Sequence, residues 1–369
     1  MNQAWWMGAA AAWMAAATCA TARGQDTEAT GAEERGAPSE AAALEAPDAG
    51  HGWGELVRFT AFWENDGTVP RPGSGSDKHY TNGLKFDFAW QPEWADRWLE
   101  WMPLSHQFGD APQTAFGLSV GQWIFTPRDI ESHEIDRDER PYAGWLGVFA
   151  YWQRSGALSD HMAMSDHIEV DGGVVGPWSG SQALQEFIHS AWPDEVEPVG
   201  WSNQIPNYPA VDLTLRRRWR FSTEENSDGV SLQCIPTVGC TVGTVYRQIE
   251  ASALVRVGWN LPDDFGPTRL ADVNAATGGW NDDFGFYLFG RAGGRAVQHN
   301  IFLDGPDWKD APQTVDSEPL VGELTVGAVL LLWRHFEIGY SQTFITEEFD
   351  TQDGPDAYGS ITLGYRASF

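Results

Sequence analysis

The sequence predicts an all-β protein, a twelve-stranded antiparallel transmembrane β-barrel with a short helix in an extracellular loop. Three observations lead to it. From residue 55 onward apolar and polar residues alternate with a period of two, which is typical of strands whose faces meet unlike surroundings. The chain contains 20 Trp, 19 Phe and 9 Tyr, which suit the aromatic girdles of outer-membrane barrels. The last predicted strand carries one apolar face that ends in an aromatic residue, as such barrels do: Ile361, Leu363, Tyr365, Ala367 and Phe369.

Composition excludes several other classes of protein. The chain has 52 Asp+Glu against 23 Lys+Arg, a net charge of −29, whereas a nucleic-acid binder needs a basic surface that meets phosphates. A mean hydropathy of −0.37 excludes a bundle of membrane helices, because each helix needs about 20 consecutive apolar residues. With 42% hydrophobic residues the chain is too apolar to stay disordered. A soluble β-sandwich with a sugar-binding aromatic surface is the alternative fold, and the long alternating strands argue against it.

The first 52 residues are predicted to precede the barrel as two segments. Residues 1–22 carry no charge, and the apolar stretch from Trp5 to Ala17 is followed by Ala20-Thr21-Ala22, which fits the A-x-A rule for signal-peptide cleavage. A short Ala-rich anchor helix is the alternative. Residues 23–52 are rich in Ala, Gly, Glu and Pro and have no hydrophobic period, so we expect a flexible acidic linker. The barrel would then occupy residues 53–369.

Twelve segments of the alternating pattern give an even number of strands, as expected for such a barrel. In the first, Val57, Phe59, Ala61 and Trp63 alternate with polar residues. A helix is predicted at Ser181–Trp192, in a long loop, because its apolar residues share one face at a spacing of 3.6. The strands are predicted near 55–64, 81–91, 115–126, 142–153, 161–175, 208–221, 229–244, 249–260, 284–298, 320–332, 334–346 and 357–369.

Two cysteines remain once the signal peptide is removed. Cys234 and Cys240 lie six positions apart in a chain that we expect to be exported. Exported proteins form disulfides readily, so we expect these two residues to close a small loop. Two unlinked thiols are the alternative, and neither arrangement points to catalysis.

The sequence contains one serine-hydrolase pattern, G-x-S-x-G, at Gly117–Gly121. In hydrolases this pattern forms a sharp strand-to-helix turn that exposes the serine. Here it lies inside an alternating strand that continues into Trp123 and Phe125. We therefore expect Ser119 to face the barrel lumen without a catalytic role.

A second group of residues is better placed for chemistry. Glu64-Asn65-Asp66 ends the first predicted strand, and Lys78–Gly83 opens the second, so the two should face each other across one hairpin. Asn65, Asp66 and Thr81 offer oxygen and amide groups, the ligands that a hard cation such as calcium prefers. His189, in the loop helix on the same side, could act as a general base near neutral pH. Turn chemistry for Asn-Asp-Gly and a loop histidine without function are the plain alternatives.

Short motifs follow one another along the chain and together resemble a known family, the LpxR-type lipid A 3′-O-deacylases of bacterial outer membranes. The resemblance extends over nearly the whole chain, from Phe59 to Phe369. The motifs are Trp63-Glu64-Asn65-Asp66, Tyr80-Thr81-Asn82-Gly83-Leu84, Gly121-Gln122, Phe125-Thr126-Pro127, Asp129-Ile130, Arg140-Pro141-Tyr142-Ala143-Gly144-Trp145-Leu146, Gly176-Pro177, Gly200-Trp201, Asn203-Gln204 and Asn300-Ile301-Phe302-Leu303-Asp304-Gly305.

The resemblance implies an active site on the outer-leaflet side, beside a loop helix. It implies calcium-dependent hydrolysis of the ester at the 3′ position of lipid A, with release of an acyloxyacyl chain. The family's functional residues fall on Asn65, Asp66 and Thr81, and its catalytic histidine falls on His189. By analogy with secreted phospholipases, His189 would take a proton from water, and calcium held partly by Asp66 would polarise the ester carbonyl. Asn65 and Thr81 would orient the metal, the water or the head group. We expect a membrane-embedded monomer that acts on lipopolysaccharide.

One departure from the family pattern concerns phosphate contact. The family has a functional lysine in the second outward loop, whereas the loop after Pro127 has only Arg128, Arg137 and Arg140. An acidic barrel that meets a phosphorylated lipid would favour a bridging divalent cation. A non-enzymatic lipopolysaccharide binder or pore of the same fold, and an outer-membrane phospholipase, are the alternative functions.

Overall fold

The computed structural model describes residues 56–68, 78–92, 94–95, 108, 112–191, 196–224, 229–273 and 282–367. It contains twelve strands, each overlapping a predicted one. The predicted signal peptide, linker and terminal Phe369 lie outside the described residues. The strands are β1 (Leu56–Asn65), β2 (His79–Trp90), β3 (Gln113–Thr126), β4 (Ala143–Ser159), β5 (Met162–Val175), β6 (Tyr208–Ser222), β7 (Val230–Gly243), β8 (Tyr246–Trp259), β9 (Phe284–Asn300), β10 (Leu320–Leu332), β11 (Phe336–Ile345) and β12 (Asp356–Arg366).

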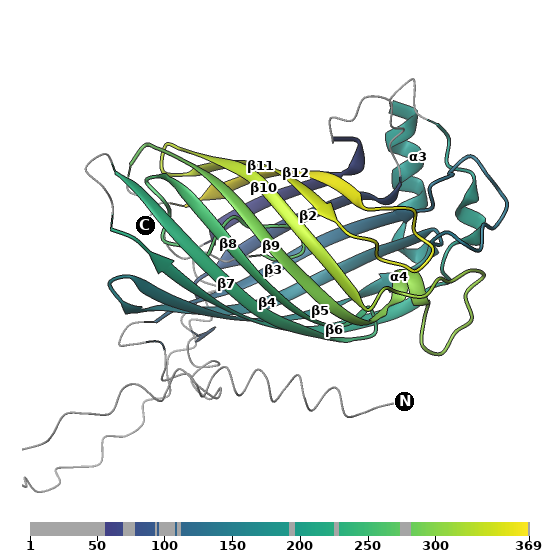
Figure 1. Ribbon diagram of the computed structural model, residues 1–369, viewed down its shortest axis with the longest axis horizontal. Helices are drawn as coiled ribbons and strands as arrows, with labels where there is room; N and C mark the ends of the chain where they lie inside the picture. Colours follow the sequence, from purple (N-terminus) through teal and green to yellow (C-terminus); the bar gives the residue numbers. More distant parts are fainter. Residues whose placement is uncertain are drawn as a thin grey trace, which may run out of the picture. The chain divides into compact units, whose positions relative to one another are not determined.

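The strands form a closed antiparallel barrel in which each strand pairs with its sequence neighbours and β12 returns to pair with β1. Phe59 lies opposite Tyr365, and Asn65 lies opposite Gly359, across this closing pair. Closure leaves no unpaired strand edge, which is required of a sheet in lipid. The short helices lie in loops at one end of the barrel, here called the helix-bearing end (Figure 1). They are η2 (Asp66–Thr68), η4 (Pro177–Ser179), α3 (Ser181–Ala191), η5 (Gly200–Asn203) and α4 (Ile301–Asp304).

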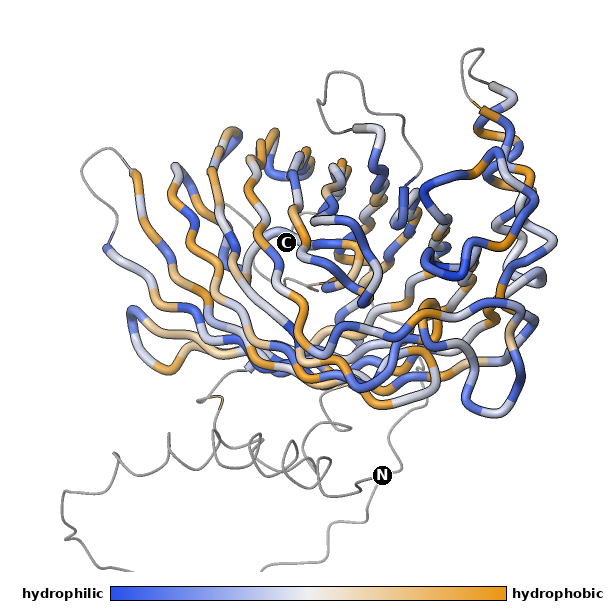
Figure 2. Tube along the Cα trace, turned by 45° about the vertical axis from the view of Figure 1, so that its right-hand side comes forward, coloured by the Kyte–Doolittle hydropathy of each residue, from blue (hydrophilic) through white to orange (hydrophobic). Residues whose placement is uncertain are grey.

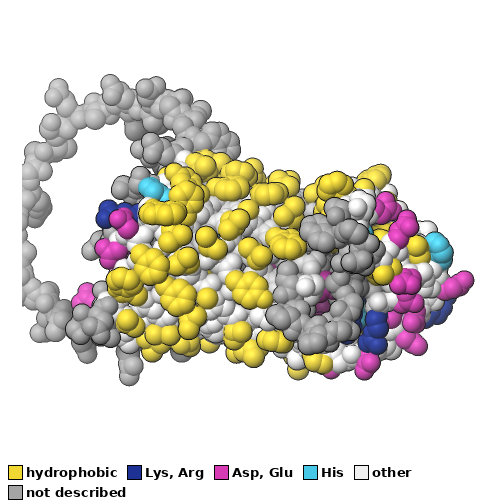
Figure 3. Space-filling view, turned by 90° about the horizontal axis from the view of Figure 1, so that it is seen from above, with side chains coloured by type: hydrophobic (Ala, Val, Ile, Leu, Met, Phe, Trp, Pro, Cys, Tyr) yellow, Lys and Arg dark blue, Asp and Glu magenta, His cyan; other side chains and the backbone are white. Residues whose placement is uncertain are grey.

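The two faces of the strands meet different surroundings, as predicted. On β1, Trp63 is exposed on the outside, whereas Arg58 and Thr60 are buried on the lumen side. Hydrophobicity alternates along the strands (Figure 2), and apolar side chains cover the outer wall while charges gather toward its ends (Figure 3). An apolar outer belt around a polar interior is the pattern of a barrel in lipid. Among the described residues, no helix is both long and apolar enough to cross a membrane.

Ion pairs fill much of the lumen. Arg295 bonds Glu348 at 2.6 Å, and Arg291 bonds Glu323 at 2.6 Å. A buried charge without a partner is costly, whereas a hydrogen-bonded pair can be tolerated. The pairs link strands to one another on the lumen side. They stabilise the barrel from within, while its outer face contacts lipid.

The loop between β8 and β9 is not a simple turn. Residues 261–273, here called the plug, fold back into the lumen. Asp264, Leu270 and Val273 are each at most 1% exposed, although turns at this end of such barrels are ordinarily short and solvated. Val273 packs with Val57, on β1, in a buried cluster. The plug therefore occupies the interior that a pore would leave open.

The predicted disulfide is wrong. Cys234 and Cys240 both lie within β7 and are free. A strand rises about 3.3 Å per residue, so six residues separate the two by roughly 20 Å, whereas bridged cysteines have Cα atoms less than about 7 Å apart. The alternative of two unlinked thiols is the correct one.

Candidate functional site

The β1–β2 hairpin brings Asn65, Asp66 and Thr81 together, as the sequence predicted. Asn65 pairs across the hairpin with Asn82, and its Nδ2 donates to the Thr81 carbonyl oxygen at 2.9 Å. Asp66 begins η2 and accepts a hydrogen bond from the Lys78 backbone N–H at 2.6 Å. The three residues therefore form one bonded unit at the helix-bearing end of the barrel wall.

Thr81 owes its position to an irregularity in β2. The register against β3 shifts between Tyr80 and Asn82, which leaves Thr81 as an extra residue in a β-bulge. Bulges re-aim side chains and often occur beside active sites. The Thr81 hydroxyl meets that of Thr126 on β3 at 2.7 Å, so a third strand fixes its direction.

The oxygen atoms of these three side chains are of the kind that binds a calcium ion. Asp66 supplies a carboxylate, Asn65 an amide oxygen and Thr81 a hydroxyl oxygen, the oxygen ligands that calcium takes, about six to eight in number. None of the described residues form a cluster of three or more His, Cys, Asp or Glu able to hold a metal. A site with one carboxylate would accordingly complete its shell with water or with oxygens of the substrate.

Helix α3 confirms the predicted loop helix and is held against the barrel wall at its start. Gln122 on β3 donates to the Ser179 carbonyl oxygen at 2.6 Å, just before the helix. On β4, Gly144 has no side chain because a Cβ there would lie 2.2 Å from the Ser181 hydroxyl. The wall and the first turn of α3 therefore approach as closely as their backbones allow.

His189 lies in the last turn of α3, with 9% of its surface exposed. Its Nδ1 is 2.5 Å from the Val196 carbonyl oxygen. A carbonyl can only accept, so Nδ1 carries the hydrogen and Nε2 of the neutral ring remains able to take a proton. One turn earlier, Gln185 accepts a hydrogen bond from the Trp201 indole at 2.8 Å. The Val196 carbonyl thus orients the ring, and the Gln185 bond holds the same face of the helix one turn earlier.

The structure puts His189 and the hairpin residues at the same end of the barrel but does not join them directly. Helix α3 contacts β3 and β4, whereas Asn65 and Thr81 belong to the neighbouring pair, β1 and β2. In the described part of the chain, no hydrogen bond links His189 to Asn65, Asp66 or Thr81. Strand β3 connects the two groups, because Gln122 contacts the start of α3 and Thr126 contacts Thr81.

The loop between β3 and β4 carries the three arginines that the sequence offered for phosphate contact. Arg128 and Arg137 both line a cavity of about 470 Å³ in this loop, and Arg128 forms an exposed ion pair with Asp353. Arg140 is fully buried, 4.5 Å over the Phe125 ring and 3.6 Å from Glu348. Arg128 and Arg137 therefore line the loop cavity, whereas Arg140 is buried between Phe125 and Glu348.

Glu139 attaches this loop to the hairpin. Its carboxylate accepts from the Arg128 backbone N–H at 2.9 Å and lies 3.2 Å from Nε2 of His79. Burial alone would raise the pKa of Glu139, but the contacts with His79 and Arg128 lower it below its ordinary value. The carboxylate consequently stays ionised at neutral pH and holds the loop close to the site.

Several roles were not apparent in the sequence but explain the motifs found there. Gly200 is required because a Cβ would lie 2.3 Å from the Tyr142 ring, and Tyr142 packs in turn against Trp201, which holds Gln185. The motifs around Gln122, Gly144 and Gly200 therefore dock α3.

Comparison with known proteins identifies the family. The model of the family described as "Outer membrane protein LpxR" matches residues 38–367. LpxR from Salmonella typhimurium has a similar structure, with a TM-score of 0.65 and 19% identity over 84% of this chain and 100% of that one. The translocator domain of the autotransporter NalP from Neisseria meningitidis is more distant, with a TM-score of 0.42 and 9% identity over 85% and 89%. None of the curated proteins matches. The chain belongs to the LpxR family of outer-membrane proteins.

Proposed function

We propose that this barrel hydrolyses the 3′-linked acyloxyacyl ester of lipid A, with calcium as its cofactor. Membership of the LpxR family makes it a lipid A deacylase of the bacterial outer membrane. The observation that carries the finer proposal is the pairing of an oxygen-rich hairpin with a docked histidine at one end of the barrel. Asn65, Asp66 and Thr81 supply hard-cation ligands, and His189 keeps Nε2 available for a proton.

The residues divide the reaction between them. His189 would take a proton from the attacking water at Nε2, while the Val196 carbonyl keeps the ring in the required tautomer. Asp66, with Asn65 and Thr81, would hold the metal and orient the ester beside it. The chemistry that bound calcium supplies is polarisation of the ester carbonyl. Arg128 and Arg137, in the adjoining loop cavity, are the cations available to the lipid A phosphates.

The outer wall and the interior of the barrel favour a deacylase over a pore. Lipid A has its acyl chains in the outer leaflet, and apolar side chains cover the outer wall of the barrel (Figure 3). The plug occupies part of the lumen, which argues against an open pore. The remaining alternatives, a lipopolysaccharide binder without activity and a phospholipase, differ from the proposal in reaction or in substrate.

Mass spectrometry of lipid A, incubated with the detergent-purified barrel, tests the proposal. With calcium we expect the lipid to lose the mass of one 3′ acyloxyacyl group, and with EDTA we expect no change. Glycerophospholipid in a parallel reaction should remain intact. Unchanged lipid A from a heat-modifiable, and hence folded, barrel would favour the binding protein, and hydrolysis of phospholipid alone would favour the phospholipase.

Replacing Ser119 with Ala should leave deacylation within about twofold of the unchanged protein. Ser119 is 1% exposed inside the barrel and donates to Asp87 at 2.7 Å. It therefore cannot meet a lipid on the outer wall, despite its G-x-S-x-G surroundings. The comparison is an initial rate at equal amounts of folded protein. Loss of activity without loss of folding would assign the nucleophile to Ser119 and overturn the histidine mechanism.

A further inference from the structure

The plug enters the lumen from the end opposite the helices and is fixed there by ion pairs. At its base Asp264 bonds Arg256 at 2.6 Å and Arg366 at 3.0 Å. At its tip Asp272 pairs with Arg218, and a short bridge between Arg269 and Asp272 closes the turn. These partners belong to strands β6, β8 and β12, so the segment is bonded around the interior wall and is an ordered part of the barrel.

The tip of the plug reaches the inner surface of β2. Leu270 is fully buried, and its carbonyl oxygen accepts from Lys85 Nζ at 3.3 Å. A Cβ on Gly83 would lie 2.9 Å from Leu270 Cδ1 and 2.1 Å from the Tyr80 hydroxyl. The leucine, the bare glycine backbone and the tyrosine ring therefore pack against one another in one layer.

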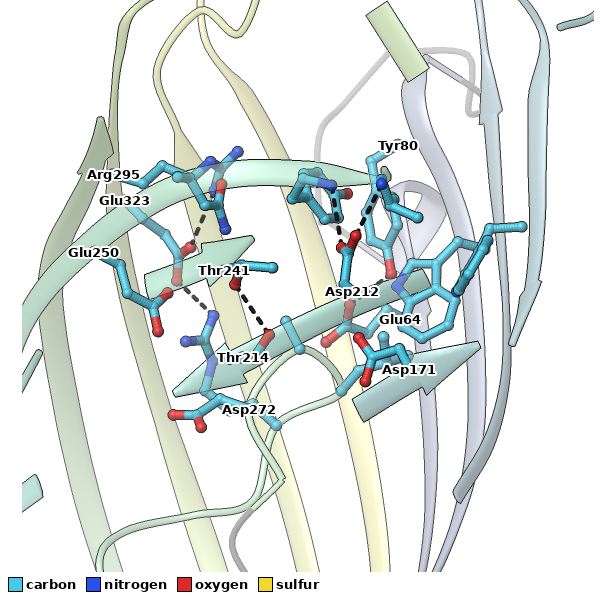
Figure 4. A pocket seen from close by; sticks show the side chains of 18 of the residues that line it. Glu64, Tyr80, Asp171, Asp212, Thr214, Thr241, Glu250, Asp272, Arg295 and Glu323 are labelled. Atoms are coloured by element: carbon cyan, nitrogen blue, oxygen red, sulfur yellow. Dashed lines mark hydrogen bonds and ion pairs between the residues drawn. The ribbon is translucent and has the colours of Figure 1, made fainter. Parts of the chain in front are cut away.

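This layer continues to β1. The Tyr80 hydroxyl donates to Glu64 at 2.7 Å, and Arg269, next to Leu270, bonds Glu323 at 2.5 Å and acts electrostatically on Glu64. Figure 4 shows Tyr80 and Glu64 directed into a cavity that Asp272 and Glu323 also line. The cavity measures about 190 Å³, and the plug tip forms part of its wall. Glu64 and Tyr80 thus have the plug on their inner side.

Glu64 and Tyr80 directly precede the candidate site residues. Glu64 is followed by Asn65 and Asp66, and Tyr80 is followed by Thr81. On β1 successive side chains point to opposite faces, so Glu64 and Asn65 face opposite ways. On β2 the bulge at Thr81 lets Tyr80 and Gly83 both face the plug. The layer and the site therefore share the same backbone. A movement of Tyr80 would therefore displace its neighbour Thr81, and a movement of Glu64 would displace its neighbour Asn65.

We propose that the plug is a positioning element for the site: Leu270, whose neighbour Arg269 is anchored to Glu323, packs on the inner face of β2 beside the Tyr80–Glu64 bond and holds Asn65, Asp66 and Thr81 in register. Leu270 is a positioning residue, because it touches neither substrate nor metal. The assignment of the site rests on the proposed function, but the packing argument rests on the contacts alone. Displacements of about 1 Å can cost a hundredfold in rate, so a brace of this kind has a measurable effect on turnover.

Leu270→Ala tests the brace, with Leu261→Ala as the matched control. Both remove the same atoms from the plug, but Leu261 packs against the cluster around Ile235 and Leu254, away from β1 and β2. We expect Leu270→Ala to speed amide hydrogen exchange in residues 79–84 at least tenfold and to lower kcat about tenfold, with KM unchanged. Leu261→Ala should do neither, and Leu270→Met should restore both values. Heat-modifiable migration confirms that each variant is folded.

The two readouts separate the possible failures. If lipid A is not hydrolysed by the unchanged protein, the proposed function fails, while faster exchange in Leu270→Ala still supports the brace. If Leu270→Ala leaves exchange in residues 79–84 and kcat unchanged, the brace is wrong. The same holds if Leu261→Ala reproduces both effects, since the plug would then act only on overall stability. If Leu270→Ala does not fold, Arg269→Gln, which keeps the leucine, takes its place with the same two readouts.

Discussion

Replacing His189 with Ala should lower lipid A deacylation by about 10²–10⁴-fold while the barrel still folds. The loss corresponds to removal of a general base, which contributes roughly that factor. Folding should survive because His189 lies in a loop helix outside the strands, and α3 is docked mainly through its first turn and through Gln185. The measurement is the initial rate of ester hydrolysis at saturating calcium, compared at equal amounts of heat-modifiable protein.

Two further variants separate proton transfer from helix packing. His189→Gln keeps a side-chain N–H that can donate to the Val196 carbonyl but has no group that takes a proton near pH 7, so it should be as inactive as His189→Ala. Ser190→Ala changes the next residue, whose hydroxyl bonds only the Phe187 carbonyl oxygen of its own helix at 2.7 Å, and should be nearly as active as the unchanged protein. Substantial activity in His189→Gln would reduce the histidine to a structural role.

The strands and the hairpin of the site could be predicted because they follow from local rules. Each strand has lipid on one side and a polar lumen on the other, so apolar and polar residues alternate with a period of two. This pattern makes each strand recognisable in the sequence. Asn65, at the end of β1, and Thr81, at the start of β2, must then meet across one turn. The structure confirms this with the bond from Asn65 Nδ2 to the Thr81 carbonyl.

The plug and the state of the cysteines could not be predicted in this way. Residues 261–273 have no apolar period, and their burial depends on ion pairs with strands far away in the sequence, such as Asp264 with Arg366. Proximity in the sequence suggested a bridge between Cys234 and Cys240, but an extended strand separates residues that a turn would bring together. The helix prediction succeeded, whereas its docking by Gln122 and Trp201 required the structure. For the plug and for the docking of the helix, the missing information was a long-range contact. For the cysteines it was not, because the predicted strand 229–244 contains both residues and already argues against a bridge.

Replacing Asp66 with Asn should weaken calcium binding about tenfold or more and reduce deacylation at low calcium. Asp66 is the one carboxylate of the hairpin unit, and the number of charged ligands strongly tunes the affinity of oxygen sites for calcium. Asparagine keeps an oxygen that can accept from the Lys78 backbone N–H, so the turn should be retained.

Calcium titration by isothermal calorimetry, in the absence of lipid, separates binding from activity. Asp307→Asn is the matched control, because Asp307 lies in a loop at the same end, where it bonds Arg247 through two contacts of 2.7 Å. It removes the same charge from the loops at this end, and its calcium affinity should be unchanged. If the two variants bind calcium equally weakly, the affinity depends on the overall negative charge of the loops and not on Asp66. If Asp66→Asn binds calcium as tightly as the unchanged protein, the ion lies elsewhere. If only Asp66→Asn is impaired, and raised calcium restores its deacylation, the metal acts at the hairpin, within the unit whose position the plug controls.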